Sequence, residues 1–91
     1  MKFAQELGID VDIAWLDDRE LSLEKISVPS TRRRKGLASQ FMQIFCERCD
    51  YHGITIHVYP TPFEGNISQH DLEEFYARFG FLIDEGGYMI R

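Results

Sequence analysis

Four consecutive basic residues, Arg32 to Lys35, stand directly before Gly36 and the start of a helical pattern. The first turn of a helix presents unpaired backbone N–H groups and the positive end of the helix dipole. Basic side chains repel that end of the dipole, so they are unfavourable there unless an anion binds between them. Phosphate is the anion most often found at a helix N-terminus. The segment Val28–Ala38 therefore predicts a phosphate-binding site.

Nucleic acid is the other common partner of such a basic cluster. The chain carries 15 acidic residues against 10 Lys and Arg, and its formal net charge is −5. Nucleic-acid-binding domains are usually basic, and they often interleave aromatic residues with the positive charges. No aromatic residue stands within Arg32–Lys35. The sequence therefore disfavours nucleic acid and favours a small phosphorylated ligand.

A zinc-like spacing occurs at Cys46-x-x-Cys49-x-x-His52. Cysteine and histidine at such intervals can bind zinc, but a second ligand pair is lacking, although His57 or His70 could contribute. Both cysteines lie beside the apolar stripe of a predicted helix, where a disulfide between them would need an awkward geometry. We expect packed, reduced thiols, no metal and an intracellular protein.

Composition sets the size and class of the protein. Ninety-one residues, 44% hydrophobic and 27% charged, predict a single globular domain over residues 1–91. No apolar run approaches the ~18 residues of a membrane helix. The first ten residues lack the apolar core of a signal peptide. We expect no membrane association and a cytoplasmic location.

Periodicity predicts the elements that position the basic cluster. Apolar residues alternate in the strands and follow helical spacing in the helices. In chain order the predicted elements are strands 11–15 and 21–28, a helix over 35–51, a strand over 54–59, a helix from a Ser68 N-cap to Phe79, and strands 81–83 and 88–90. In the second strand the apolar positions change from odd to even numbers around Glu24–Lys25. Such a phase change predicts a β-bulge, a feature often found next to active sites.

The predicted order is β-β-α-β-α-β-β, typical of an α+β (α/β) fold. A strand–helix–strand unit forms a right-handed crossover that makes its two strands parallel. We therefore expect a mixed sheet with a central β-α-β crossover and two main helices. The basic cluster would then lie at the carboxyl ends of the parallel strands, where ligands of such folds bind.

Two motifs resemble those of the GCN5-related N-acetyltransferases (the GNAT superfamily). The family's Gln/Arg-x-x-Gly-x-Gly/Ala signature is matched by R-R-K-G-L-A at residues 33–38. Val28 stands eight residues before the glycine, where the family's cofactor-binding strand ends. The family's Tyr-x-x-x-Gly-Phe pattern is matched by Y-A-R-F-G-F at residues 76–81. The resemblance covers residues 21–91 and implies a GNAT-like sheet whose central parallel strands splay apart.

The resemblance implies acetyl-coenzyme A as the acyl donor, with direct transfer to a primary amine such as a protein lysine or a small polyamine. The first helical turn would hold the pyrophosphate, and the preceding strand would pair with the pantetheine arm. Gly36 would permit the close approach of the cofactor. Carried over by position, the cofactor-binding residues are Ile26, Ser27, Val28, Arg33, Arg34, Lys35, Gly36, Leu37 and Ala38, with Gln69 or Ser68 where the family often has Asn.

Acetyl transfer needs a neutral amine and a protonated leaving thiolate, whereas a free lysine amine has a pKa of ~10.4 and a thiol one of ~8.5. Tyr76 is the candidate acid that protonates the coenzyme A sulfur. Glu24, at the predicted bulge, is the candidate base acting through a water, and His57 is its substitute. Each has a structural alternative: a core aromatic, a solvent-facing strand residue and a structural histidine, respectively.

The sequence gives the least information about the place where the acceptor amine would bind. Larger family members carry one or two helices before the hairpin, whereas only residues 1–10 precede the first strand here. We expect an open acceptor side with loop 61–66 at its edge, or one completed by a homodimer or another partner. Residues 67–76 resemble short phage-encoded members of the family of the anti-CRISPR type. The alternative function is a non-catalytic acyl-CoA-binding or protein-interaction module on the same fold.

Overall fold

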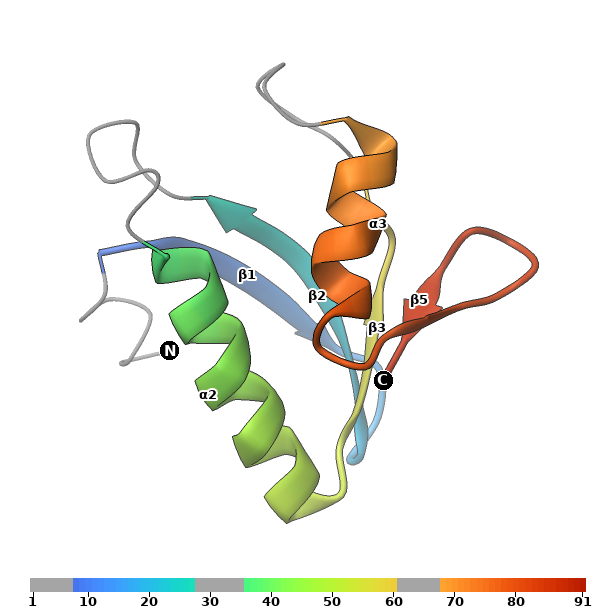
Figure 1. Ribbon diagram of the computed structural model, residues 1–91. Helices are drawn as coiled ribbons and strands as arrows, with labels where there is room; N and C mark the ends of the chain where they lie inside the picture. Colours follow the sequence, from blue (N-terminus) through green and yellow to red (C-terminus); the bar gives the residue numbers. More distant parts are fainter. Residues whose placement is uncertain (1–7, 28–35, 61–67) are drawn as a thin grey trace.

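The computed structural model describes residues 8–27, 36–60 and 68–91. A five-stranded mixed sheet carries two helices on one face (Figure 1). The elements are β1 (Asp10–Trp15), β2 (Glu20–Ser27), α2 (Leu37–His52), β3 (Thr55–Val58), α3 (Gln69–Ala77), β4 (Leu82–Ile83) and β5 (Met89–Ile90), and the strand order in the sheet is β1-β2-β3-β5-β4. The predicted α+β class, the central crossover and the two main helices are confirmed. Within the described ranges, neither helix is long and apolar enough to cross a membrane.

β1 and β2 form an antiparallel pair with the predicted bulge. Asp12 pairs with Lys25, whereas the next residue, Ile13, pairs with Leu23, so Glu24 is an extra residue in β2. Side chains alternate along a strand with a period of two, and one extra residue shifts that alternation. The bulge therefore keeps the apolar positions before and after it on the same face of the sheet.

β2 and β3 are parallel, as the crossover predicted. Their pairing runs from Glu20 opposite Thr55 to Leu23 opposite Val58. β2 continues to Ser27, whereas β3 ends at Val58, and no described residue of β3 pairs with this extension. The two central strands therefore stop pairing at the bulge, which is the splay that the resemblance implied.

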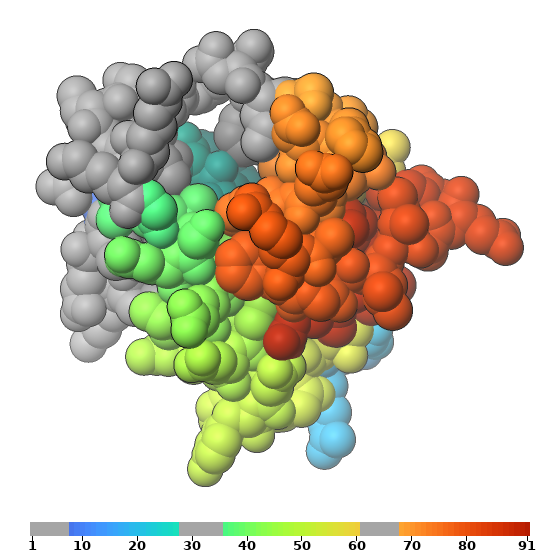
Figure 2. Space-filling model, in the orientation of Figure 1, coloured from blue at the N-terminus to red at the C-terminus, as the bar shows by residue number. Residues whose placement is uncertain are grey.

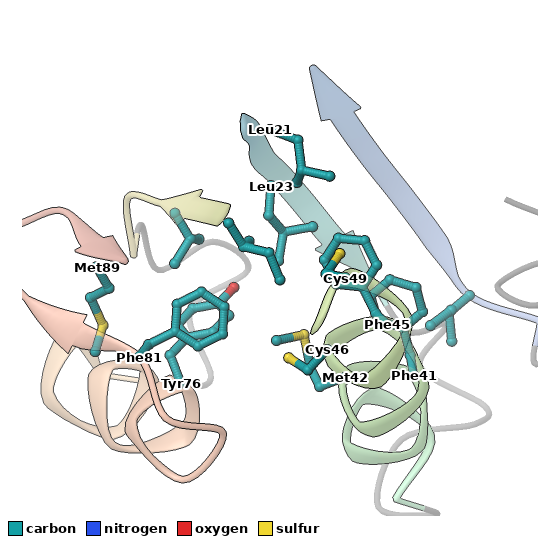
Figure 3. Packing of buried hydrophobic residues seen from close by; sticks show 13 residues of the cluster. Leu21, Leu23, Phe41, Met42, Phe45, Cys46, Cys49, Tyr76, Phe81 and Met89 are labelled. Carbon is teal, nitrogen blue, oxygen red and sulfur yellow. The ribbon is translucent and has the colours of Figure 1, made fainter. Parts of the chain in front are cut away.

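One apolar core fills the space between the sheet and the two helices (Figure 3). Phe41, Met42 and Ile56 are fully buried, and the rings of Phe41 and Phe45 stack with centroids 5.2 Å apart. The buried set contains Ile9, Leu21, Leu23, Phe41, Met42, Phe45, Cys46, Cys49, Ile56, Val58, Tyr76, Phe81 and Met89. Because both helices contribute to this one core, burial fixes the positions of their N-termini relative to the sheet.

The helix ends follow local sequence signals, with one difference. Gly53 adopts a φ of +67° after α2, and the Ser68 hydroxyl accepts a hydrogen bond from the Asp71 N–H (3.1 Å), as expected of an αL C-cap and an N-cap. The prediction that the second helix continues to Phe79 was wrong, because α3 ends at Ala77. Gly80 has a φ of +88°, and this turn directs the following phenylalanine into the core rather than into a strand.

Arg91 ties the end of the chain to both helices. Its guanidinium pairs with Asp50 of α2 and donates a hydrogen bond to the Phe79 carbonyl beyond α3. Its backbone exchanges two hydrogen bonds with Ile56, with N···O distances of 3.0 and 3.1 Å. The last residue therefore connects α2, the turn after α3 and the central strand β3.

Candidate functional site

Both helices begin at the end of the sheet where β2 ends (Figure 1). In Figure 2, β2 is visible at the bottom of a hollow between the first turns of α2 and α3. The first turn of α2 contains no acidic residue. Its N–H groups, including those of Leu37 and Ala38, have no partner within the helix and carry the positive end of the dipole. The predicted phosphate site therefore has an uncompensated positive terminus at one wall of the hollow.

Gly36 is the N-cap residue of α2. It has a φ of +70° and a ψ of 17°, the left-handed conformation that glycine adopts more easily than other residues. A Cβ added at this position would meet none of the described atoms within 4 Å. The backbone conformation, rather than crowding by the described residues, favours a glycine here. The space that a Cβ would enter is open, which suits the close approach of a ligand.

The end of β2 supplies the other wall. Ile26 and Ser27 are half-buried, and both pair with β1 on one side. On the β3 side the backbone has no strand partner among the described residues. An extended ligand chain could form hydrogen bonds along this edge, as the resemblance implied for pantetheine. The remaining predicted cofactor contacts, Val28, Arg33, Arg34 and Lys35, and the loop 61–66 lie outside the described residues.

Gln69 was predicted as a cofactor contact at the start of the second helix. Its side-chain Nε2 donates a hydrogen bond to the Pro60 carbonyl at 2.7 Å. This bond joins the first turn of α3 to the chain that leaves β3. In the structure, Gln69 therefore holds the α3 N-terminus beside the end of β3.

Tyr76 lies on the inner face of α3 and is only 7% exposed. Its ring lies against those of Phe75 and Phe81, with centroids 5.4 and 5.5 Å away. Figure 3 shows the hydroxyl oxygen pointing away from α3 toward the side chains of α2 and β2. Burial raises the pKa of Tyr76 to about 12, so the hydroxyl stays protonated at neutral pH. Tyr76 is both a core aromatic and an available hydrogen-bond donor.

A pocket lies on the sheet face that the helices leave uncovered. Its volume is about 430 Å³, and its walls include both residues weighed as the base, Glu24 and His57. Strand alternation explains the position: Ser22 pairs with His57 on this face, whereas their neighbours Leu21 and Ile56 point into the core. The full lining is Leu16, Ser22, Leu23, Glu24, His57, Tyr59 and Tyr88. The pocket therefore opens beside the point where β2 and β3 stop pairing.

Sequence reasoning missed the carboxylate that holds His57. The His57 Nε2 lies 2.8 Å from the Glu20 Oε1, and the two side chains are 23% and 42% exposed. The pKa of Asp17 is lowered mainly by the hydrogen bond from the Arg19 N–H and then by the side chain of Glu20, and the charge of His57 makes a smaller contribution. The signal was present in the parallel register, because residues 20 and 22 of one strand and residue 57 of the other share a face. That register could not be read from either strand alone.

The pocket wall also has an aromatic pair that the sequence did not reveal. The rings of Tyr59 and Tyr88 meet edge to face with centroids 4.8 Å apart. Leu16, 58% exposed, is part of the same lining. Together these side chains give the pocket an apolar wall beside its acidic and imidazole groups.

The two cysteines are free and buried in the core face of α2. Burial is the main cause that raises the pKa of Cys46, to about 11, and that of Cys49. These are packed, protonated thiols, as predicted. In the part of the chain that the structure describes, no three His, Cys, Asp or Glu side chains form a group that could hold a metal ion.

Several solved structures are similar to this chain. The anti-CRISPR protein AcrVA5 matches with a TM-score of 0.69 and 24% identity, over 89% of this chain and 97% of that one. Ard1 from Thermoplasma volcanium matches with a TM-score of 0.65 and 18% identity, over 91% of this chain and 61% of its own. This chain thus spans less than two thirds of Ard1. No protein-family model matches the chain, and no curated protein matches it by sequence. At these identities the comparison concerns the fold, which is that of GNAT-type acetyltransferases.

Proposed function

We propose that this protein is an N-acetyltransferase that uses acetyl-coenzyme A as a substrate and passes the acetyl group directly to a primary amine. One observation carries the proposal. The parallel strands β2 and β3 stop pairing at the Glu24 bulge, between a helix N-terminus on one face and a pocket on the other. Such an opening lets a donor and an acceptor approach the same point from opposite faces of the sheet. The fold similarity supports acetyl transfer as the reaction.

The helix side is the proposed donor site. The first-turn N–H groups of α2, with Arg33, Arg34 and Lys35, would bind the pyrophosphate. The free edge of β2 over Ile26–Val28 would pair with the pantetheine arm, and a backbone amide near Ile26 would polarise the acetyl carbonyl. The left-handed Gly36 and the open space around it fit this arrangement.

Tyr76 is the proposed hydrogen-bond donor to the leaving sulfur. Its pKa of about 12 exceeds the ~8.5 of a thiol, so complete proton transfer to a free thiolate would cost about 5 kcal/mol. A hydrogen bond that stabilises the developing thiolate avoids that cost. Full transfer becomes favourable when the proton lost by the acetylated nitrogen replaces the one that Tyr76 gives.

The uncovered face is the proposed acceptor side. Glu24 on the pocket wall suits a cationic amine, and so does the acidic balance of the chain. The acceptor would be a protein lysine or a small polyamine. A homodimer that completes this open side remains a prediction, which sedimentation of the purified chain would test.

Calorimetric titration with acetyl-coenzyme A, followed by a thiol-release assay with a lysine peptide and with spermidine, tests the proposal. We expect binding in the submillimolar range and release of coenzyme A only when an amine is present. Binding without thiol release would support the non-catalytic acyl-CoA-binding module instead. No binding at submillimolar cofactor would overturn both functions.

A further inference from the structure

We propose that His57, held by Glu20, accepts the proton of the acceptor amine, while Glu24 binds the ammonium group before that proton leaves. This inference rests on the proposed acetyl transfer and names its base and the class of amine it accepts. That class is a primary ammonium on an apolar stem. The contact between His57 and Glu20 and the side chains of the pocket wall support it.

The imidazole of His57 is oriented by the carboxylate of Glu20. Glu20 contacts the Nε2 of His57 at 2.8 Å but does not line the pocket, whereas His57 does. A carboxylate at Nε2 favours the tautomer with the hydrogen on that nitrogen, which leaves the lone pair on Nδ1. None of the described residues donates a hydrogen bond to Nδ1. The contact with Glu20 at Nε2 therefore orients the ring, and Nδ1 remains able to accept a proton.

The charges around His57 favour a cation at this position. Glu20 contacts the ring from β2, Glu24 lines the same pocket, and Asp17 of the hairpin turn contributes a smaller interaction. The other titratable groups on the pocket wall are the phenols of Tyr59 and Tyr88. No Lys or Arg of the described residues lines the pocket. An imidazolium formed here would be stabilised by carboxylates and opposed by no lining cation.

The division of roles between the two candidate bases follows from their surroundings. An imidazole is a stronger base than a carboxylate, with reference pKa values of ~6.5 and ~4.3. The exposed Glu24 has no ion-pair partner among the described residues, so its carboxylate is available to bind an incoming ammonium group. His57 already has a partner that orients it. The carboxylate therefore binds the amine, and the imidazole removes its proton.

The apolar part of the wall defines the rest of the substrate. The edge-to-face rings of Tyr59 and Tyr88, with Leu16, can pack against methylene groups, and aromatic faces also attract cations. A lysine side chain and a polyamine both present an ammonium on such a stem. Ammonia or a short hydroxylated amine has no apolar stem that could pack against this wall.

In the proposed acetyl transfer, each proton that moves has a donor and an acceptor. The ammonium gives one proton to His57 Nδ1, and the neutral nitrogen attacks the thioester carbonyl carbon. The C–N bond forms and the C–S bond breaks, and the sulfur leaves with the electron pair. The sulfur takes a proton from Tyr76, which regains one from the acetylated nitrogen. The imidazolium releases its proton to water, so each turnover releases one proton.

The experiment compares His57→Gln and Glu20→Gln with Glu47→Gln, which changes an exposed carboxylate of α2 that does not line the pocket. The substrates are acetyl-coenzyme A with a lysine peptide, or with spermidine, or with ethanolamine. We expect His57→Gln to lower kcat about 100-fold and to remove the acidic limb of the kcat/KM profile. Glu20→Gln should lower kcat by a smaller factor, because the imidazole then loses the carboxylate that orients it. Glu47→Gln should do neither, and Glu24→Gln should raise KM for cationic amines.

A second readout does not need turnover. The ring nitrogen signals of His57, recorded by NMR in the protein alone, should show the Nε2–H tautomer in the wild type and in Glu47→Gln, and a mixture of tautomers in Glu20→Gln. If the wild type releases thiol while His57→Gln keeps both rate and acidic limb, the assignment of the base is wrong although the proposed function stands. Failure of the wild type to bind acetyl-coenzyme A overturns both. Equal use of ethanolamine and the lysine peptide overturns the substrate class, and a preference for spermidine assigns the polyamine.

Discussion

Replacing Gly36 separates the folding of the α2 N-terminus from its proposed role in binding the donor. The glycine has a φ of +70°, and an L-residue in that conformation costs about 1–2 kcal/mol. The added Cβ of Gly36→Ala meets no described atom within 4 Å, so steric overlap adds nothing to that figure. We expect Gly36→Ala to fold with a free energy of unfolding lowered by about 1 kcal/mol, measured by urea denaturation.

The same substitution should affect acetyl-coenzyme A much more than it affects the fold. If the pyrophosphate lies against the first turn of α2, the new Cβ occupies space that the ligand needs, and we expect at least tenfold weaker binding by calorimetry. Gly36→Asn is the matched control for the backbone, because asparagine tolerates the left-handed conformation better while also carrying a Cβ. It should recover stability but not affinity. Wild-type affinity in both variants would refute the placement of the pyrophosphate at this helix.

Three other predictions concern residues whose environment is known. Tyr76→Phe should lower kcat about tenfold or more with little change in acetyl-coenzyme A affinity, measured by thiol release and calorimetry, and an unchanged kcat would remove the hydroxyl from the mechanism. Arg91→Ala removes the ion pair with Asp50 and the hydrogen bond to the Phe79 carbonyl, and should lower the free energy of unfolding by about 1–3 kcal/mol in urea melts. Cys46 has a pKa raised from 9.0 to about 11, so its contribution to stability is present below pH 9 and is lost as the pH rises through 11. The Tm should fall over that range less steeply in Cys46→Ala than in the wild type.

The features predicted correctly are those that the sequence encodes locally. The apolar phase change around Glu24–Lys25 located the bulge, because strand alternation has a fixed period. Ser68 was identified as an N-cap from its own side chain and the residues that follow it. The end of α3 was misjudged because Gly80 acts three residues beyond the last helical residue. The turn at Gly80 depends on how Phe81 packs in the core, and apolar periodicity does not specify that packing.

The features that sequence reasoning missed are pairings between distant segments. Glu20 was not identified as a site residue from the sequence, yet its carboxylate contacts a histidine 37 positions away. The contact depends on the register between β2 and β3, two strands that α2 separates along the chain. The Tyr59–Tyr88 contact depends in the same way on β5 pairing with β3. The sequence therefore allowed candidate catalytic residues to be named, but it did not allow the side chains that contact them to be named.

The bulge at Glu24 links the two proposed half-sites. Without the extra residue, alternation would turn Ile26 out of the core, and the part of β2 proposed to pair with the donor would present its other face. With it, the strand keeps its apolar face on the helices beyond the point where β3 ends, and the inserted residue itself lines the pocket on the opposite side. One insertion thus holds the proposed donor edge in place and presents a carboxylate to the proposed acceptor side. The proposed division of roles is consistent with this geometry, because the bulge exposes the Glu24 carboxylate to an incoming amine, whereas Glu20 orients His57 on the neighbouring strand.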